Sequence, residues 1–454
     1  MALTNKLRYF PTTFAWGVAT AAYQIEGAAT IDGRGSSIWD EFSHTPGKVL
    51  SGDTGDIACD HYHRYPEDIA LMNHIGVTHY RFSVSWPRIL PDGDSHHINA
   101  KGLAFYDRLV DTLLDNQIIP AITLYHWDLP SELQIQGGWL NSRTSDVFAE
   151  YAQIMVAVLG DRVKQWITHN EPWCTAVLGH LTGEHAPGVT SKDAALTAAH
   201  HVLLSHGKAM MAMRSTRNDL QIGITLNLSQ VYPDQPSVES IRAASLQDVF
   251  NNRWYLDPLF LGHYPEELID IFGKQPQFLS HDMDLIKQPL DFLGVNYYSA
   301  QVVAPSGDNE SPWPVRHVTP KDRITAMGWP VIPKGLTDLL MRLQRDYGPI
   351  PLFITENGAA YPDEIVDGRI HDVDRIEYLS DHIEAIADAL AHGVDVRGYF
   401  LWSLLDNFEW AFGYSKRFGI VYVDYTTLER TLKDSAQWYG RLIHDALSLP
   451  LNPV

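Results

Sequence analysis

Cysteine is almost absent from this sequence of 454 residues, which contains only Cys59 and Cys174. Small secreted domains held together by disulfides carry many cysteines, so that class of protein is excluded. Long apolar runs are missing too: no stretch of about 18 apolar residues suggests a transmembrane helix. The first residues also lack the apolar segment of about 7–15 residues that marks a signal peptide. We therefore expect a cytoplasmic protein without a membrane partner.

Basic residues are in the minority. The chain has 34 Lys and Arg against 55 Asp and Glu, a formal net charge of −21. Nucleic acids and anionic membranes are bound mainly through Lys and Arg, so the charge balance argues against both as partners. A hydrophobic content of 45% with 20% charged residues is typical of a folded globular protein.

The sequence shows no linker, low-complexity segment or block of like charge. At roughly 150 residues per domain its length would suggest about three domains. A single α/β barrel with insertions, however, can exceed ~400 residues. We expect one domain over residues 1–454.

One pattern recurs along the chain: a short apolar, β-rich run, then a turn, then a helical stretch. The candidate strands are residues 14–18, 79–83, 118–124, 163–168, 221–226, 290–295, 352–355 and 398–401. The helical stretches are residues 66–75, 103–116, 145–159, 192–214, 237–250, 336–347, 374–392 and 434–446. Continuous apolar strands suit a parallel sheet covered on both faces.

Eight such units predict an α/β fold, a single (β/α)8 TIM barrel with elaborated βα loops. The alternative is an open doubly wound sheet. That fold would need a glycine-rich phosphate turn after its first strand to bind a nucleotide, and no G-x-G-x-x-G occurs there.

Active sites of such barrels lie at the C-terminal ends of the strands. Side chains that can hydrogen-bond or stack follow nearly every predicted strand: Gln24, Arg81, Ser83, His126, Trp127, Asn170, Glu171, Asn227, Asn296, Tyr298, Glu356, Asn357 and Trp402. Glutamate is a poor strand residue, yet Glu171 and Glu356 end the fourth and seventh runs. Paired carboxyls are what glycoside hydrolysis requires: one protonates the leaving oxygen, and the other attacks the anomeric carbon or activates water.

Two motifs, Asn170-Glu171-Pro172 and Thr355-Glu356-Asn357-Gly358, resemble the active-site motifs of glycoside hydrolase family 1, the β-glucosidase family. The resemblance runs from about residue 9 to about residue 445. It is carried further by the ordered segments at residues 14–27, 80–86, 124–128, 294–298 and 402–410.

The resemblance implies a retaining mechanism in which Glu171 is the general acid/base and Glu356 the nucleophile. It implies that Arg81 and Tyr298 hold the nucleophile charged and oriented. It also implies a shell around the non-reducing sugar: Gln24, His126, Trp127, Asn170, Asn296, Trp402, Glu409 and Trp410, with Trp402 as the stacking floor. On the aglycone side it implies Cys174, Leu178, His185 and Trp329.

The implied substrates are terminal β-D-glucosyl residues, and also galactosyl and fucosyl residues, of small β-glycosides such as cellobiose or aryl glucosides. A 6-phospho-β-glycosidase remains an alternative, although such enzymes carry a small residue where this chain has Glu409, and Phe418 stands where they have Tyr. Lys416 is retained. A catalytically silent sugar-binding module on the same fold is a second alternative; such relatives lack one or both carboxylates.

A segment with metal-ligand residue types, Cys59-Asp60-His61-x-His63, lacks the spacing of a structural zinc site. The residue 53–56 loop resembles a calcium loop only in composition. We expect no metal and no cofactor, since carboxylates suffice for the chemistry. A homo-oligomer is left open. Trp16, Trp39 and Trp86 are interpreted as core residues.

Overall fold

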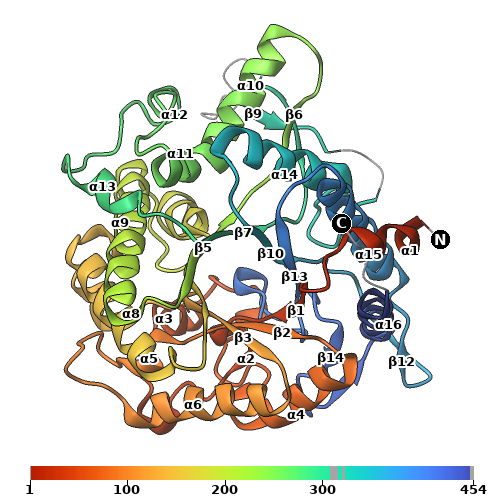
Figure 1. Ribbon diagram of the computed structural model, residues 1–454. Coiled ribbons are helices and arrows are strands. Elements are labelled where there is room, and N and C mark those ends of the chain that lie inside the picture. Colours follow the sequence, from red (N-terminus) through yellow and green to blue (C-terminus); the bar gives the residue numbers. More distant parts are fainter. Residues whose placement is uncertain (1, 307–314, 320–322, 450–454) are drawn as a thin grey trace.

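The structure, a computed structural model, describes residues 2–306, 315–319 and 323–449. Eight parallel strands close into a barrel and follow one another around it in chain order. They are β1 (Ala15–Ala19), β2 (His79–Ser83), β3 (Ile119–Tyr125), β4 (Gln165–Asn170), β5 (Gln221–Asn227), β7 (Phe292–Asn296), β10 (Leu352–Asn357) and β13 (Val396–Trp402). Figure 1 shows these strands at the centre of the molecule with helices around them. The predicted barrel is confirmed, and every predicted strand boundary lies close to the observed one.

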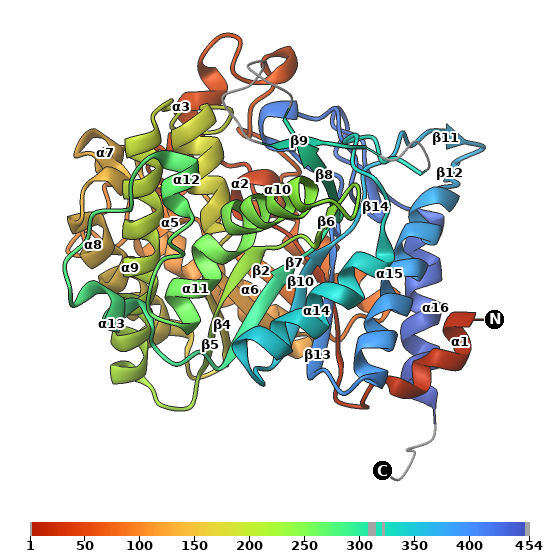
Figure 2. The same cartoon turned by 90° about the horizontal axis from the view of Figure 1, so that it is seen from above.

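Long helices cover the barrel, as Figure 2 shows from a second direction, and most of them pack on the next long helix along the chain. They are α4 (His61–Ile75), α6 (Ala100–Asp115), α8 (Arg143–Leu159), α9 (Lys192–Thr216), α14 (Pro333–Tyr347), α15 (Val373–Ala391) and α16 (Asp434–Ser448). α16 returns to α4 and closes the ring. Helix α4 begins five residues before the predicted start at Pro66, because the buried His61 and Tyr62 extend it toward its N-terminus.

The fifth unit differs from the prediction. The helix expected after the fifth strand is α10 (Val238–Asp248), and it packs on a small sheet of β6 (Val231–Pro233), β8 (Gln301–Pro305) and β9 (Val315–His317). The segments that follow it are η6 (Val249–Arg253), which contacts β5, and α11 (Trp254–Phe260), which packs on η6 and holds the fully buried Trp254. Apolar periodicity identifies a helix but not the apolar surface that it covers.

The interior of the barrel has an apolar layer and, toward the C-terminal ends of the strands, a polar layer. A cluster of buried residues fills the apolar layer: Ala15, Ala19, Ala121, Ile167, Phe292, Phe353, Phe400 and Trp402. Gly294 leaves room for Thr225 and Thr355, since a Cβ at this glycine would lie 2.2 Å from the Thr225 hydroxyl. The polar layer above, toward the C-terminal strand ends, holds Arg81, Asn170, Asn296 and Glu356, all buried.

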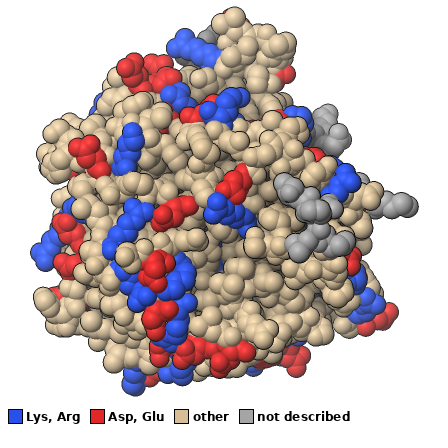
Figure 3. Space-filling view, viewed as in Figure 1, with Lys and Arg blue, Asp and Glu red and all other residues tan. Residues whose placement is uncertain are grey.

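Charged side chains on the molecular surface are intermixed. On the face in Figure 3, Lys and Arg lie beside Asp and Glu without a large area of one sign. Surface pairs such as Lys164 with Asp219 and Arg162 with Asp107 have this arrangement. Among the described residues, no helix has the length and apolar character needed to cross a membrane.

Candidate active site

The two glutamates predicted from the sequence meet inside the barrel. Glu171 directly follows β4, and Glu356 lies near the end of β10; both side chains are buried, at 6% and 3% exposure. The strand register is irregular close to both: between Ile167 and Asn170 on β4, directly before Glu171, and between Ile354 and Glu356 on β10. Bulges of this kind redirect side chains, here toward the pocket.

Glu356 is held by donors on both carboxylate oxygens. Arg81 donates from Nη1 to Oε1 at 2.7 Å, and the Tyr298 hydroxyl donates to Oε2 at 2.5 Å. Burial raises the pKa of Glu356, while the Arg81 guanidinium and the Tyr298 hydroxyl oppose that rise by stabilising the charged form. Burial and the nearby Glu356 charge raise the pKa of Tyr298 well above its ordinary value, so the phenol stays a donor.

Glu171 is surrounded differently, because neither of its oxygens contacts a cation in the described part of the chain. Asn296 donates from Nδ2 to Oε1 at 2.6 Å, and the Cys174 thiol lies 3.0 Å from Oε2. Burial, and then the Glu356 charge, raise the pKa of Glu171 to about 7. A carboxyl with that pKa is protonated to a useful extent near neutral pH, as a general acid must be.

Asn170 connects the two carboxyls through one hydrogen-bond network. Its Oδ1 accepts from Arg81 Nη2 at 2.7 Å and from Asn296 Nδ2 at 3.0 Å. Guanidinium nitrogens can only donate, which assigns the amide orientation and directs Nδ2 to His126 Nε2 at 3.1 Å. His126 therefore carries its proton on Nδ1.

Two buried polar atoms of the predicted sugar shell have no hydrogen-bond partner among the described residues. One is His126 Nδ1, and the other is Oε1 of Gln24. Gln24 is fixed through Nε2, which donates to Asn407 Oδ1 at 3.0 Å and to the Phe408 carbonyl at 2.8 Å. Buried polar atoms are nearly always satisfied, so an unpaired donor and an unpaired acceptor are suited to ligand hydroxyls.

Aromatic rings form a wall beside these atoms. The His126 ring stacks at 5.8 Å on Trp402 and at 5.9 Å on Trp410. Trp127 lies 4.5 Å from Trp410 and donates from Nε1 to the Asn170 carbonyl. Indole faces of this kind are suited to the CH face of a hexose.

Backbone geometry at three site residues is unusual. Trp127, Glu171 and Trp410 have φ angles of 78°, 47° and 51°. Residues with a Cβ rarely occupy this left-handed region, and bulky ones do so least of all. Strain of this kind persists where the surrounding structure fixes the backbone, commonly at functional sites.

Comparison with known proteins identifies the family. The family model described as Glycosyl hydrolase family 1 matches residues 6–446. Beta-glucosidase A of Acetivibrio thermocellus is 52% identical over 96% of this chain and 98% of its own length. A bifunctional beta-D-glucosidase/beta-D-fucosidase of Bifidobacterium breve is 45% identical, with the same two shares. The beta-glucosidase of Thermotoga maritima, solved with glucoimidazole, superposes with a TM-score of 0.94 at 48% identity, covering 97% of this chain and 99% of that one.

The chain belongs to glycosyl hydrolase family 1.

Within this family 1 site, Glu409 stands apart as a third carboxyl. It lies half-buried just after Phe408, and Gln24 Nε2 lies 3.4 Å from its Oε2. Burial, and then the charges of Glu356 and Glu171, raise its pKa to about 8. A proton on Glu409 limits the charge repulsion among three neighbouring carboxyls.

The four residues predicted on the aglycone side fall into three places. Cys174 and Leu178 lie on the wide helical segment η5 (Cys174–Thr182), and Cys174 contacts Glu171 directly. The His185 ring lies 5.1 Å from Trp39 and 5.4 Å from Trp127, beside the aromatic rings of the predicted sugar shell. Trp329 packs at 5.4 Å on Tyr298, on the side of Glu356.

Sequence reasoning missed the threonines beneath the carboxyls. Thr123 accepts from Arg81 Nε at 3.1 Å, and Thr355 donates to Asn296 Oδ1 at 2.8 Å while its carbonyl accepts from Arg81. Their inward direction follows from strand alternation only after the register and the bulge of β10 are known. Trp39, expected in the core, is fully buried and lies 4.6 Å from Trp410, so it supports the pocket from behind.

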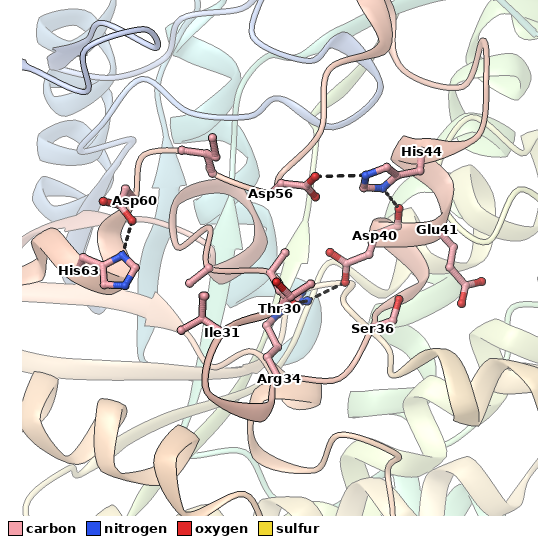
Figure 4. Close-up of a pocket in the computed structure, with 13 residues that line it drawn as sticks. Thr30, Ile31, Arg34, Ser36, Asp40, Glu41, His44, Asp56, Asp60 and His63 are labelled. Atoms are coloured by element: carbon pink, nitrogen blue, oxygen red, sulfur yellow. Dashed lines mark hydrogen bonds and ion pairs between the residues drawn. The ribbon is translucent and has the colours of Figure 1, made fainter.

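The segment with metal-ligand residue types lies elsewhere, beside a hollow of ≈ 670 Å³. Figure 4 shows His44 directed at Asp56, and His63 at Asp60, among the residues that line this hollow. His61 forms a hydrogen bond with Asp68 and does not line the hollow. Across the described residues, no group of three or more His, Cys, Asp or Glu side chains is placed to bind a metal.

Proposed function

We propose that Glu171, as acid/base, and Glu356, as nucleophile, carry the retaining β-glucosidase reaction of this chain. The observation that carries the assignment is the difference between the hydrogen-bond donors of the two carboxyls. Glu356 accepts hydrogen bonds from a guanidinium and a phenol, while Glu171 accepts them from an amide and a thiol. A cation in contact keeps a carboxyl charged, as a nucleophile requires, and its absence favours the protonated acid.

In the first step Glu356 attacks the anomeric carbon while Glu171 protonates the glycosidic oxygen, and the aglycone leaves. The sugar is then a covalent ester of Glu356, which has lost its negative charge. That charge is the second cause of the raised pKa of Glu171, after burial. The pKa of Glu171 therefore falls, and the carboxylate takes a proton from the water that hydrolyses the ester.

The sugar is held by complementary polar and apolar groups. Gln24 Oε1 accepts from one hydroxyl, His126 Nδ1 donates to another, and Glu409 accepts beside Gln24. Trp402 and Trp410 cover the CH face. We expect terminal β-glucosyl residues of cellobiose and aryl glucosides, and also galactosyl and fucosyl residues, as substrates. Relatives named 1,4-beta-D-glucan glucohydrolase, 50% identical in Thermotoga neapolitana, and beta-D-glucosidase/beta-D-fucosidase support this range. The cytoplasmic location and a homo-oligomer stay predictions from the sequence.

The assignment of the two glutamates is tested with a matched pair of variants, Glu356→Ala and Glu171→Ala. Each is assayed with 2,4-dinitrophenyl β-glucoside in the presence of azide. Azide fills the space of the deleted carboxyl, so Glu356→Ala should form the α-glucosyl azide and Glu171→Ala the β-glucosyl azide. The same anomer from both variants, or wild-type rates without azide, would contradict the assignment.

The 6-phosphorylated alternative is disfavoured by the surroundings of Glu409. A phosphate would meet this carboxyl, and the Lys416 ammonium is bonded to the Ala326 carbonyl at 2.7 Å. Phe418 adds an apolar ring that packs at 6.1 Å on Tyr298. Cellobiose and its 6-phosphate, compared as substrates at equal concentration, decide the question. Faster cleavage of the glycosidic bond in cellobiose 6-phosphate than in cellobiose would overturn the proposal.

A further inference from the structure

The two cysteines of the chain have different surroundings. Cys59 is fully buried, and its thiol donates to the Asp406 carbonyl. Cys174 is 7% exposed, and its Sγ lies 3.0 Å from Oε2 of Glu171. Its backbone N–H donates to the Glu171 carbonyl at 2.9 Å, which fixes the thiol relative to the carboxyl. Cys59 has a packing role, whereas Cys174 touches a group that moves a proton.

The carboxyl of Glu171 has one oxygen free to carry that proton. Oε1 accepts from the Asn296 amide at 2.6 Å, and an amide N–H can only donate. Oε2 is therefore the oxygen that is protonated before the first step. In the described part of the chain, the Cys174 thiol is the only side chain that hydrogen-bonds to Oε2.

A thiol is suited to this place because it both donates and accepts, and does both weakly. A guanidinium or ammonium group could only donate and would keep Glu171 ionised. Burial, and then the Glu171 charge, raise the pKa of Cys174 well above its ordinary value, so the thiol keeps its own proton. Cys174 is thus neither a thiolate nucleophile nor a competing acid.

Other titratable groups face this contact from several elements, but none of them hydrogen-bonds to Glu171 among the described residues. Glu356 on β10 and Glu409 after β13 contribute negative charge, and Arg81 on β2 contributes positive charge that Glu356 and Asn170 share. Tyr298 follows β7 and donates to Glu356. Tyr255 on α11 lies on the side of Cys174, with its hydroxyl unpaired in the described structure.

We infer that Cys174 is a positioning residue for the acid/base: its thiol donates to Oε2 while Glu171 is ionised and accepts while that oxygen is protonated. The inference rests on the proposed role of Glu171. In the first step the proton leaves Oε2 for the aglycone oxygen as the bond from that oxygen to the anomeric carbon breaks. The S–H then turns toward Oε2. In the second step Oε2 takes a proton from the attacking water, and the thiol returns unchanged.

The test compares Cys174→Ala, which removes the partner, with Cys174→Ser, which keeps a group that donates and accepts. Cys59→Ala is the control for loss of a buried thiol elsewhere. For each enzyme kcat/KM is measured against pH with cellobiose, which needs the proton, and with 2,4-dinitrophenyl β-glucoside, which does not. Thermal unfolding of each variant reports on packing.

Cys174→Ala should raise the pKa of Glu171, because its carboxylate loses a hydrogen-bond donor. The basic limb of the pH profile of kcat/KM for cellobiose should therefore move to higher pH by about 0.5–1 unit. Its kcat/KM for cellobiose at the optimum should fall several-fold more than that for the dinitrophenyl substrate. Cys174→Ser should restore the limb, and Cys59→Ala should leave it in place. An unmoved limb in Cys174→Ala with equal losses on both substrates would reduce Cys174 to a packing residue.

Glu171→Gln, measured in parallel, separates this outcome from a failure of the proposed function. If Glu171 is the acid, this variant loses the basic limb for cellobiose altogether. If the basic limb survives in Glu171→Gln, the assignment of Glu171 itself is contradicted. If the basic limb disappears in Glu171→Gln but stays at the wild-type pH in Cys174→Ala, only the inference about the thiol is contradicted.

Discussion

Arg81 donates from Nη1 to Oε1 of Glu356 at 2.7 Å, although the two residues are 275 positions apart in the chain. The contact spans the barrel from β2 to β10. The same guanidinium donates from Nη2 to Asn170, the residue before Glu171. One fully buried cation thus fixes the geometry on both sides of the pocket, and it contacts only one of the two carboxyls.

The pH dependence of the wild-type enzyme follows from this asymmetry. The pKa of Glu171 is about 7, and its proton is needed in the first step, so activity is lost as pH rises through that value. We expect kcat/KM for cellobiose to fall about tenfold per pH unit above pH about 7. Initial rates at low substrate concentration, from pH 5 to 10 in buffers of constant ionic strength, check this. A flat profile to pH 9 would contradict the role of Glu171.

Replacing Tyr298 with Phe should move the acidic limb of the pH profile of kcat/KM. The variant removes a 2.5 Å donor from the carboxylate of Glu356, so the pKa of Glu356 rises and the acidic limb shifts to higher pH. Hydrogen bonds to charged groups contribute about 1.5–3 kcal/mol, which corresponds to a shift of roughly one to two units. Tyr439→Phe removes a buried hydroxyl that donates to the Gly17 carbonyl and serves as the matched control. An acidic limb in the same place for both variants would disprove the proposed role of Tyr298.

Gln24 tests recognition of the sugar. Gln24→Ala removes the unpaired acceptor Oε1 and should lower kcat/KM for aryl glucosides by about 2- to 10-fold, as expected for a neutral hydrogen bond worth ~0.5–1.5 kcal/mol. The loss should disappear for the one monodeoxy glucoside that lacks the hydroxyl bound by Gln24. An equal loss for every deoxy substrate would show that Gln24 acts only through the fold.

Lys433 tests how the loop that carries Glu409 is supported. Its ammonium is fully buried and donates to Asp406 at 2.7 Å and to Asp363 at 2.5 Å. Removing one member of a buried ionic pair costs about 3–5 kcal/mol, so Lys433→Met should lower the melting temperature by several degrees and raise KM.

Lys164→Met is the control for Lys433→Met. Lys164 pairs with Asp219 at the surface with 44% of its side chain exposed, and such pairs contribute less than ~1 kcal/mol. Calorimetric scans at one fixed rate compare the two variants. Equal shifts in both would mean that the buried pairs of Lys433 add nothing to stability.

The sequence by itself determined the eight strands and the enclosing helices, and it predicted Glu171 and Glu356 as the catalytic pair. Continuous apolar runs such as β7 can be stable only when both faces are covered. Glu171 and Glu356 were singled out by the motifs in which they stand at the ends of two such runs. Local pattern carries this information, because side-chain periodicity and strand propensity depend on neighbours along the chain.

Only the tertiary structure decided which side chains contact each of the two carboxyls. The register of β4 and β10 sets which residues face inward, and the bulge next to Glu356 places Thr355 beneath it. The contact of Cys174 with Glu171 depends on the path of η5, and the place of α10 on the small sheet depends on the loops. Closure of the barrel brings together side chains that are far apart in the chain, such as Arg81 and Glu356. Burial and hydrogen bonding then give the two carboxyls different pKa values.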